Sequence, residues 1–262
     1  RGAIVTVDQN WKSAGASSGT FQYDPTAAVD IQALHDGEVV ADTFTYTLIE
    51  DTTTPNSFGF KSQTAATVTI TLTGVNDAPI SQDIPLSAFE DGIAVTADFD
   101  GDDVDNDDDF DSLTFSIVDT LSAGEGTVAN NGDGTFTFVP GSDFQELAQD
   151  QEFDVSFTYK ATDQHGEDSN VSTVTITVTG VNDAPTAIPD TRIVDQNVVA
   201  SEAADGVLTN DDEPDTADSK VVTKLNGTDL DIVSSSLTIT STKGATFTLN
   251  VDGSFSYDPT TS

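Results

Sequence analysis

Alternation of polar and apolar residues dominates this chain, and it occurs twice in nearly the same form. The stretches at residues 67–72 (Thr-Val-Thr-Ile-Thr-Leu) and 173–178 (Thr-Val-Thr-Ile-Thr-Val) place an apolar side chain at every second position. A period of two puts these side chains on one face of an extended chain, as is typical of a half-buried strand. Each stretch therefore predicts a β-strand with one face in a core.

Both predicted strands run directly into the same seven-residue phrase, Thr-Gly-Val-Asn-Asp-Ala-Pro, at residues 73–79 and 179–185. Glycine interrupts the strand pattern, and proline restricts the residue before it to an extended conformation. The Asn-Asp pair places side-chain and backbone oxygens in a short, stiff segment. Because the two copies lie about one hundred residues apart, the repeat has the size of a small domain. We interpret the phrase as the last strand of a β-domain followed by a linker.

The rest of the pattern divides the chain into three units, at residues 1–75, 80–181 and 186–262. A turn followed by an aromatic-rich strand, Gly-Thr/Ser-Phe-x-Phe/Tyr or a close variant, occurs in each unit. Only the second unit contains every element between two linkers, with about seven short strands and a hairpin turn at residues 131–134. The pattern predicts an all-β fold of tandem β-sandwich domains. The first unit is expected to lack its front part and the third its back part.

Charge adds a constraint that the strand pattern does not reveal. The 262 residues include 46 acidic and 8 basic side chains, for a formal net charge of −38. This self-repulsion works against a compact state unless a counter-charge is present, and bound cations would supply it. The same charge argues against nucleic acid and against an anionic membrane surface as partners. Disorder is the alternative for so acidic a chain, but strand patterns fill most of the sequence.

The highest charge density lies at residues 98–111, where nine of fourteen residues are Asp. Carboxylates so close together must bind a cation or become partly protonated. Ca²⁺ suits them, because it takes 6–8 oxygen ligands in irregular geometries. The EF-hand spacing is absent, since neither its glycine nor its final glutamate is in place. The alternative is a solvated acidic loop without a bound ion.

Signals for catalysis are weak, and we predict that the chain is not an enzyme. It has two histidines, no cysteine and no Gly-x-Ser-x-Gly elbow. His165 lies in a predicted turn and is expected to be an ordinary surface residue. Two further alternatives stay open: an isopeptide link from Lys160 to an asparagine, and stacking of Trp11 on a sugar.

The second unit resembles cadherin repeats, and more closely the bacterial cadherin-like (VCBS-type) tandem domains of large secreted or surface adhesins. The phrase Val-Asn-Asp-Ala-Pro is similar to the calcium-binding linker of that family. Shorter matches carry the rest of the resemblance: Glu90 in Phe-Glu-Asp-Gly, Asp98 and Asp100 in Asp-Phe-Asp, Asp150 in Leu-Ala-Gln-Asp, and Asp163 in Ala-Thr-Asp. The sequence departs from the family pattern at three places. Glycine replaces the first Asp of the linker in both copies, one Asn is lost before Ala, and Asp150 stands where the family has Glu. The departures imply fewer ligands, and therefore fewer ions, at each junction.

The resemblance implies tandem cadherin-like or Ig-like β-sandwich domains joined by short calcium-binding linkers, with Ca²⁺ at both. At the first linker the implied ligands are Asn76, Asp77, Asp98, Asp100 and Asp163, with Asp36 or Glu38 as a further contribution from the first unit. At the second linker they are Glu90, Asp150, Asn182 and Asp183, joined from the third unit by Asp211 and Asp212. Within the acidic run, Asp98 and Asp100 are expected to matter more for calcium binding than Asp107 and Asp109.

Two functions follow from this interpretation. The first is a calcium-rigidified structural segment of a bacterial cell-surface or secreted adhesin or filament, which would serve extension, cell adhesion or biofilm assembly outside the cell. The alternative is a polysaccharide-binding cadherin-like module, with extracellular polysaccharide as its partner. The incomplete end units also suggest head-to-tail pairing with other copies of the chain; an arbitrary segment of a longer protein is the other explanation.

Overall fold

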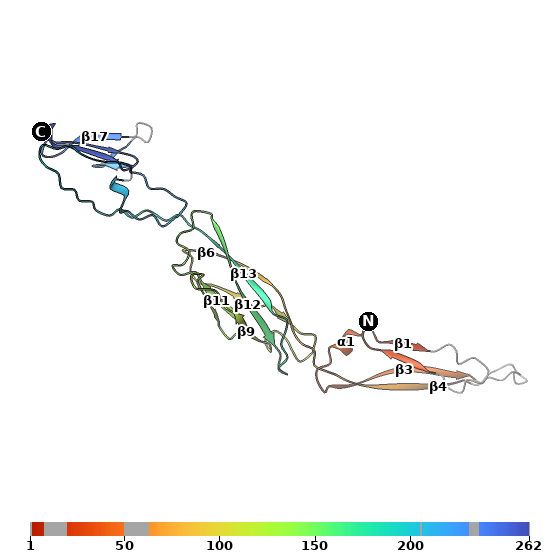
Figure 1. Cartoon of the computed structure of the whole chain (residues 1–262). Helices are drawn as coiled ribbons and strands as arrows, with labels where there is room; N and C mark the ends of the chain where they lie inside the picture. The colour runs from red at the N-terminus through yellow and green to blue at the C-terminus, as the bar shows by residue number, and fades with distance from the viewer. Residues whose placement is uncertain (1, 8–19, 50–62, 205, 231–235, 262) are drawn as a thin grey trace, which may run out of the picture.

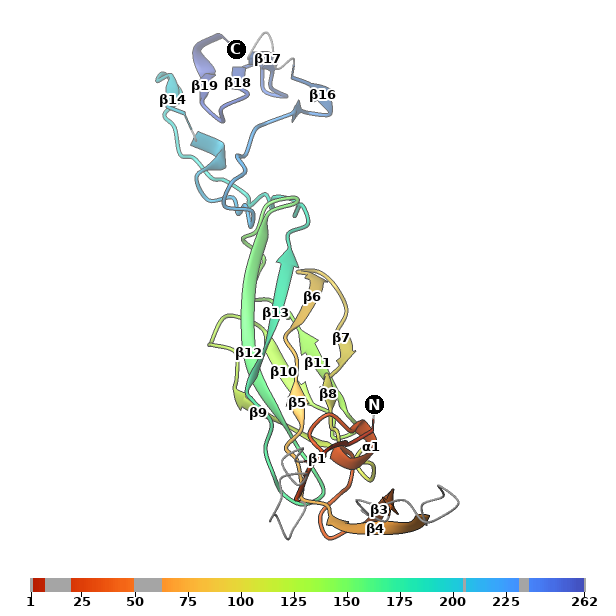
Figure 2. The ribbon, with the colours of Figure 1, turned by 90° about the vertical axis from the view of Figure 1, so that its right-hand side faces the viewer.

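The structure is a computed structural model, and it describes residues 2–7, 20–49, 63–204, 206–230 and 236–261. Trp11, which the sequence suggested for sugar stacking, lies outside these ranges. Figures 1 and 2 show three units that follow one another along an elongated molecule, with the second unit in the middle. Nearly all of the regular structure is β, as the sequence predicted.

The second unit contains two main sheets and a short ribbon. One sheet has the order β10-β11-β7, and the other has the order β6-β13-β12-β9, in which β6 and β13 are parallel. The ribbon pairs β5 with β8. The bounds are β5 Ile80–Ser81, β6 Ile84–Phe89, β7 Val95–Asp98, β8 Gly101–Asp102, β9 Thr114–Asp119, β10 Thr127–Asn130, β11 Thr135–Val139, β12 Glu152–Thr162 and β13 Ser172–Thr179.

The core of the second unit lies between these two sheets. Phe136 of β11 packs edge-on against Phe157 of β12, with their ring centroids 5.2 Å apart. The hydroxyl of Tyr159, whose side chain is fully buried, donates to the backbone carbonyl oxygens of Gln82 and Asp100, at 2.6 and 2.8 Å. This sheet-on-sheet packing is a β-sandwich, and the predicted fold class is confirmed.

The first unit forms two separate strand pairs. β1 (Ile4–Val7) pairs with β2 (Phe21–Asp24), and β3 (Val39–Ile49) pairs with β4 (Gln63–Thr73). A single helical turn, α1 (Val29–Gln32), connects the two pairs. These pairs correspond in order to β10-β11 and β12-β13 of the second unit.

The third unit contains a four-stranded sheet in the order β14-β19-β18-β17 and a two-stranded ribbon, β15-β16. Short 3-10 helices occur at Gly206–Leu208 and Pro259–Thr261. The strand bounds are β14 Ala200–Glu202, β15 Lys224–Leu225, β16 Thr228–Asp229, β17 Ser236–Thr240, β18 Thr246–Asn250 and β19 Phe255–Asp258.

Candidate metal sites at the two junctions

The second junction, around the linker at residues 180–185, brings together three carboxylates from separate parts of the chain, two buried and one half-buried. Glu90 follows β6 and is 1% exposed, and its Oε1 accepts a hydrogen bond from the Val181 backbone N–H at 2.6 Å. Asp183 lies in the linker, and the fully buried Asp215 lies in the third unit. One carboxylate oxygen of each residue lies within 4.8 Å of the others. Residues before, within and after the linker therefore converge at one point.

Asp215 is held there by a loop of the third unit that contacts the second unit directly. Its Oδ2 accepts a hydrogen bond from the Asp183 backbone N–H at 3.1 Å. The next residue, Thr216, donates to the carbonyl oxygen of Glu146 through both its backbone N–H and its hydroxyl, each at 3.1 Å. The linker and the two units are thus joined by hydrogen bonds around the three carboxylates.

These carboxylates lack a compensating charge. Glu90 Oε2, Asp183 Oδ2 and Asp215 Oδ1 are buried without a hydrogen-bond partner. No Lys or Arg forms an ion pair with them in the described part of the chain. Burial raises the pKa of Glu90, against the lowering effect of the Val181 N–H, and the charges of Asp183, Asp91 and Asp215 raise it further. Burial also raises the pKa of Asp183, with the charges of Asp91 and Asp215 adding to the effect.

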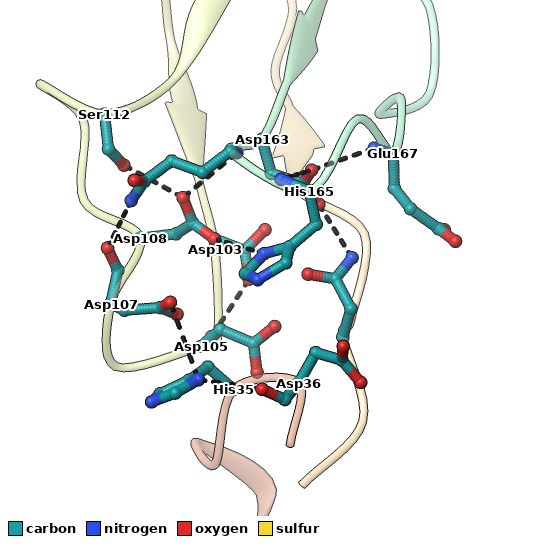
Figure 3. A network of polar contacts seen from close by, with 12 residues as sticks. His35, Asp36, Asp103, Asp105, Asp107, Asp108, Ser112, Asp163, His165 and Glu167 are labelled. Carbon is teal, nitrogen blue, oxygen red and sulfur yellow. Dashed lines mark hydrogen bonds and ion pairs between the residues drawn. The ribbon is translucent and has the colours of Figure 1, made fainter. Parts of the chain in front are cut away.

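The first junction, around the linker at residues 74–79, has a similar cluster (Figure 3). The Asn76 side-chain amide donates to Asp163 Oδ2 at 2.8 Å. The Asp77 backbone N–H donates to Asp105 Oδ2 at 2.9 Å. Asp163, which follows β12, shares a second group with two residues of the acidic loop. One oxygen each of Asp103, Asp108 and Asp163 lies within 4.8 Å of the others.

The carboxylates of the first junction are also poorly compensated. Burial raises the pKa of Asp103 and of Asp105, and the charges of neighbouring aspartates add to this. Burial acts on Asp163 in the same direction, but the hydrogen bond from Asn76 and those from nearby backbone N–H groups lower its pKa overall. The buried oxygens without a partner at this junction are Asn76 Oδ1, Asp103 Oδ2, Asp105 Oδ1 and Asp108 Oδ2.

The two junctions repeat one local design. The side-chain amides of Asn76 and Asn182 each donate to the backbone carbonyl oxygen of the following Asp. The backbone N–H of that Asp then donates to Asp105 at the first junction and to Asp215 at the second. Two residues before each of these partners stands an acid, Asp103 or Glu213, that also has an unpaired buried oxygen. An acid-x-Asp pair after each linker is therefore part of the repeat.

Comparison with known proteins identifies the second unit. Residues 76–180 match a family model described as "Bacterial cadherin-like domain". This segment is a bacterial cadherin-like domain. The match includes the acid-x-Asp pair at the first linker and the strand β13 that leads into the second linker, and it confirms the resemblance of this unit to bacterial cadherin-like domains. No curated protein matches the chain.

Among solved structures, similar chains include two cadherins. Drosophila N-cadherin EC1-4 is 15% identical, with 84% of this chain and 50% of that chain covered and a TM-score of 0.34. Chicken VE-cadherin EC1-2 is 14% identical, with 70% and 85% covered and the same TM-score of 0.34. A SusE-like surface-located polysaccharide-binding protein of Bacteroides thetaiotaomicron is 13% identical, with 64% and 31% covered and a TM-score of 0.26. The chain spans half the length of the N-cadherin structure, and similarities this low indicate nothing about function.

No helix in the described ranges has the length and apolar character needed to cross a bilayer. The regular structure around the cadherin-like domain is almost entirely short strands.

Close packing explains why glycine replaces the first Asp of each linker. A Cβ at Gly180 would overlap the Ala148 carbonyl oxygen and would lie 2.7 Å from the Leu147 carbonyl oxygen. A Cβ at Gly74 would overlap the carbonyl oxygens of the corresponding loop in the first unit in the same way. The backbone N–H of Gly180 donates to the Gln151 carbonyl oxygen at 2.7 Å. The glycine lets the linker approach the cadherin-like domain, which a side chain would prevent.

The structure brings six of the residues suggested by the sequence to the junctions: Asn76, Asp77, Glu90, Asp163, Asn182 and Asp183. Glu38 is also near the first junction, where its Oε2 accepts a hydrogen bond from the Asn106 side chain at 2.9 Å. Asp36 lies beside it, and its backbone oxygen is 3.1 Å from His35 Nδ1.

Other suggested residues lie outside the clusters. Asp98 ends β7 with an exposed side chain, and Asp100 is also exposed. Asp150 sits in an exposed turn with φ of 62°, where its Oδ1 accepts a hydrogen bond from the Gln149 side chain. Asp211 Oδ1 accepts a hydrogen bond from the Ile188 N–H, and Asp212 pairs through its backbone with residue 186. Lys160 forms an ion pair with Asp168.

The residues that sequence reasoning missed are Asp103, Asp105, Asp108, Glu213 and Asp215. The repeated acid-x-Asp pattern after each linker was the signal that would have located four of them. Asp103-Val-Asp105 was hidden inside the run at residues 98–111, while Glu213-Pro-Asp215 followed the more conspicuous Asp211-Asp212 pair.

The two clusters fit a hard divalent cation. Their donors are carboxylate, amide and backbone oxygens, which Ca²⁺ prefers. Buried polar atoms are normally paired, so several unpaired carboxylate oxygens that face one another call for a ligand. A cation would satisfy these oxygens. It would also offset the cost of burial that raises the pKa of Glu90 and the smaller contribution from the charges of Asp183, Asp91 and Asp215.

Proposed function

We propose that this chain is a calcium-rigidified structural segment of a bacterial cell-surface or secreted adhesin, in which bound ions fix neighbouring domains in line. It extends the adhesin and takes no part in catalysis. Its place of action is outside the cell.

One observation supports this proposal above the others: unpaired carboxylate oxygens gather at both linkers. At the second junction they come from both sides of the linker, and at the first they come from the domain that follows it. Glu90 belongs to the cadherin-like domain, Asp183 to the linker and Asp215 to the third unit. A cation held by all three would couple the position of one unit to the next. The residues that would hold calcium are Asn76, Asp77, Asp103, Asp105 and Asp163 at the first junction, and Glu90, Asn182, Asp183, Glu213 and Asp215 at the second.

The clusters also explain why the segment would depend on its ion. Without a cation, like charges at short range repel, and the linker contacts must resist that repulsion. With a cation bound, the same carboxylates favour the joined arrangement. An ion that binds only the folded state stabilises it by about 4 kcal/mol at a thousandfold excess over Kd.

Calorimetric titration of the chelator-treated chain with Ca²⁺ tests the proposal. We expect saturable binding at both junctions. Glu90→Gln should weaken the second site at least tenfold, because it removes one anionic ligand but keeps the acceptor for the Val181 N–H. Asp163→Asn should do the same at the first site. Asp98→Asn is the matched control, since its side chain is exposed and outside the clusters.

Absence of calcium binding, or equal losses in Asp98→Asn and Glu90→Gln, would contradict the proposal. A glycan array provides a separate test of the polysaccharide-binding alternative. Saturable glycan binding that is unchanged by chelation would favour that alternative over a structural role.

A further inference from the structure

Both histidines of the chain lie beside the acidic loop at the first junction, although they come from different units. His35 lies in the first unit, and its Nδ1 is 3.6 Å from Asp107 Oδ2. His165 lies in the cadherin-like domain, and its Nδ1 is 3.8 Å from Asp108 Oδ2. Figure 3 shows the two imidazole rings near the same segment of the acidic loop. Ca²⁺ binds oxygen ligands and not imidazole nitrogens, so the calcium clusters do not explain why the histidines lie here.

Asp108 provides a buried and partly unsatisfied carboxylate at this position. Its side chain is fully buried. Its Oδ1 accepts hydrogen bonds from the Ser112 hydroxyl at 3.0 Å and from the Gln164 backbone N–H at 3.4 Å. Its Oδ2 has no hydrogen-bond partner. One oxygen therefore fixes the side chain, and the other is left directed toward the His165 ring.

We propose that Asp107, Asp108 and His165 bind a transition-metal ion of the Zn²⁺ type, and that His35 of the first unit becomes a fourth ligand when its Nδ1 exchanges the Asp36 carbonyl oxygen, now 3.1 Å away, for the metal. One ligand atom each of Asp107, Asp108 and His165 already lies within 4.8 Å of the others. Around a tetrahedral Zn²⁺ with bonds of about 2.0–2.2 Å, neighbouring ligand atoms are about 3.3–3.5 Å apart. The histidine–carboxylate distances of 3.6 and 3.8 Å are close to that separation.

The second junction lacks two of these ligands at the corresponding positions. The Asn106 backbone N–H donates to the Ala33 carbonyl oxygen, and the Thr216 N–H donates to that of Glu146. By this alignment, Ala148 and Ala217 occupy the positions of His35 and Asp107, whereas Asp218 occupies that of Asp108. The site is therefore specific to the first junction, whereas the oxygen clusters are common to both.

The zinc site adjoins the first calcium cluster, because one oxygen of Asp108 also lies within 4.8 Å of Asp103 and Asp163. The two sites remain chemically distinct: one contains imidazole nitrogens and the other only oxygen donors. A bound zinc ion would link the loop of His35 to the cadherin-like domain. It would thus restrain the first junction and leave the second unchanged.

Titration of the full chain with Zn²⁺ tests this site, using protein without a histidine tag and with excess Ca²⁺ present. Isothermal calorimetry should show one saturable zinc site per chain. Nitrogen NMR of the imidazole rings should show both histidine signals shifting with the same saturation curve. Because the chain has only two histidines, each signal can be assigned from a single variant.

The variants separate this site from the calcium clusters. His165→Ala should weaken zinc binding at least tenfold, and His35→Ala and Asp107→Ala should each weaken it measurably. Asp111→Asn, an exposed residue of the same loop, is the matched control and should leave zinc binding unchanged. Glu90→Gln should lower calcium binding at the second junction without changing the zinc affinity.

Three results would overturn the inference: no saturable zinc binding, an unchanged zinc affinity in His165→Ala, or displacement of zinc by millimolar calcium. The last would mean that zinc binds only the carboxylates of the calcium cluster. Retention of the wild-type melting temperature in calcium would confirm that each alanine variant is folded.

Discussion

Glu90 is a buried carboxylate at the second junction whose charge is only partly compensated. Its carboxylate is 1% exposed and faces Asp183 and Asp215 without a cationic side chain nearby. The single hydrogen bond from Val181 satisfies only one of its two oxygens. The charge of Glu90 therefore opposes folding when no cation is bound and favours it when one is.

The change of sign predicts that Glu90→Gln raises the free energy of unfolding in chelator and lowers it in calcium. Because the pKa of Glu90 is raised above its ordinary value of 4.5, the folded chelated state binds this proton more tightly than the unfolded state. The free-energy cost of burying the ionised Glu90 carboxylate is therefore present at neutral pH, and it is relieved as pH falls through the raised pKa. In chelator, Glu90→Gln should be more stable than wild type near neutral pH, with an advantage that shrinks toward pH 4.5. In excess calcium it should be less stable.

Thermal unfolding of both proteins across this pH range, with and without calcium, gives the comparison. The control is Asp98→Asn. Its stability relative to wild type should not change sign between chelator and calcium, and in chelator it should not vary with pH in this range. A Glu90→Gln variant less stable than wild type in chelator would show that the carboxylate is already compensated by the protein.

The sequence did not show in which direction each aspartate side chain of the acidic run points. Asp98 and Asp100 match an Asp-x-Asp pattern, but Phe99 between them is buried in the core at 2% exposure. Successive residues of an extended chain point to opposite faces, so burial of Phe99 turns both aspartates outward. Asp105, by contrast, is buried and accepts the Asp77 N–H. The sequence alone did not reveal which pair of the run faces the linker.

At the scale of single elements, β4 and β13 show how one sequence pattern gives different burial. Val174, Ile176 and Val178 of β13 are fully buried between the two sheets. Along β4, the alternate apolar residues are only partly buried, because the described part of the first unit faces the β3-β4 pair with only the two short strands β1 and β2. Alternation predicted both strands, but the extent of burial depends on what packs against them.

This difference predicts unequal costs for the same substitution in the two strands. Ile176→Ala should destabilise the cadherin-like domain by about 2–5 kcal/mol, since it leaves a cavity in a packed core. Ile70→Ala at the corresponding position of β4 should cost much less. Chemical denaturation in excess calcium measures both. Equal losses would mean that β4 is covered in solution by a partner, such as another copy of the chain.

The sequence located strands better than it located the loops that build the sites. The hairpin turn at residues 131–134 forms as expected, with Gly132 and Gly134 at φ of 78° and 84°. Linker glycines were interpreted only as lost ligands, because the close approach of the loop at residues 147–148 depends on tertiary packing. Contacts between units, such as Thr216 with Glu146, leave no periodic pattern in the sequence.

For the whole molecule, the junctions determine whether the three units behave as one body. Small-angle X-ray scattering in calcium should fit a single elongated shape such as that in Figure 1. Chelation should broaden the distribution of dimensions, because the repelling carboxylates loosen both linkers. Glu90→Gln in calcium should show an intermediate result, with one junction loosened. Identical scattering with and without chelator would contradict calcium-dependent stiffness.

Head-to-tail association with other copies stays a prediction from the sequence. The partly buried apolar face of β4 is the surface on which it would be tested.

The parallel pairing of β6 and β13 has a consequence under mechanical load. The first linker leads into the start of the cadherin-like domain near β6, and the second leaves from the end of β13. Because the strands are parallel, with Ile84 opposite Val174 and Phe89 opposite Thr179, tension applied through the two linkers pulls the strands past each other lengthwise. Their hydrogen bonds then bear the force together in shear and do not open one at a time. The domain should therefore resist stretching between its two linkers.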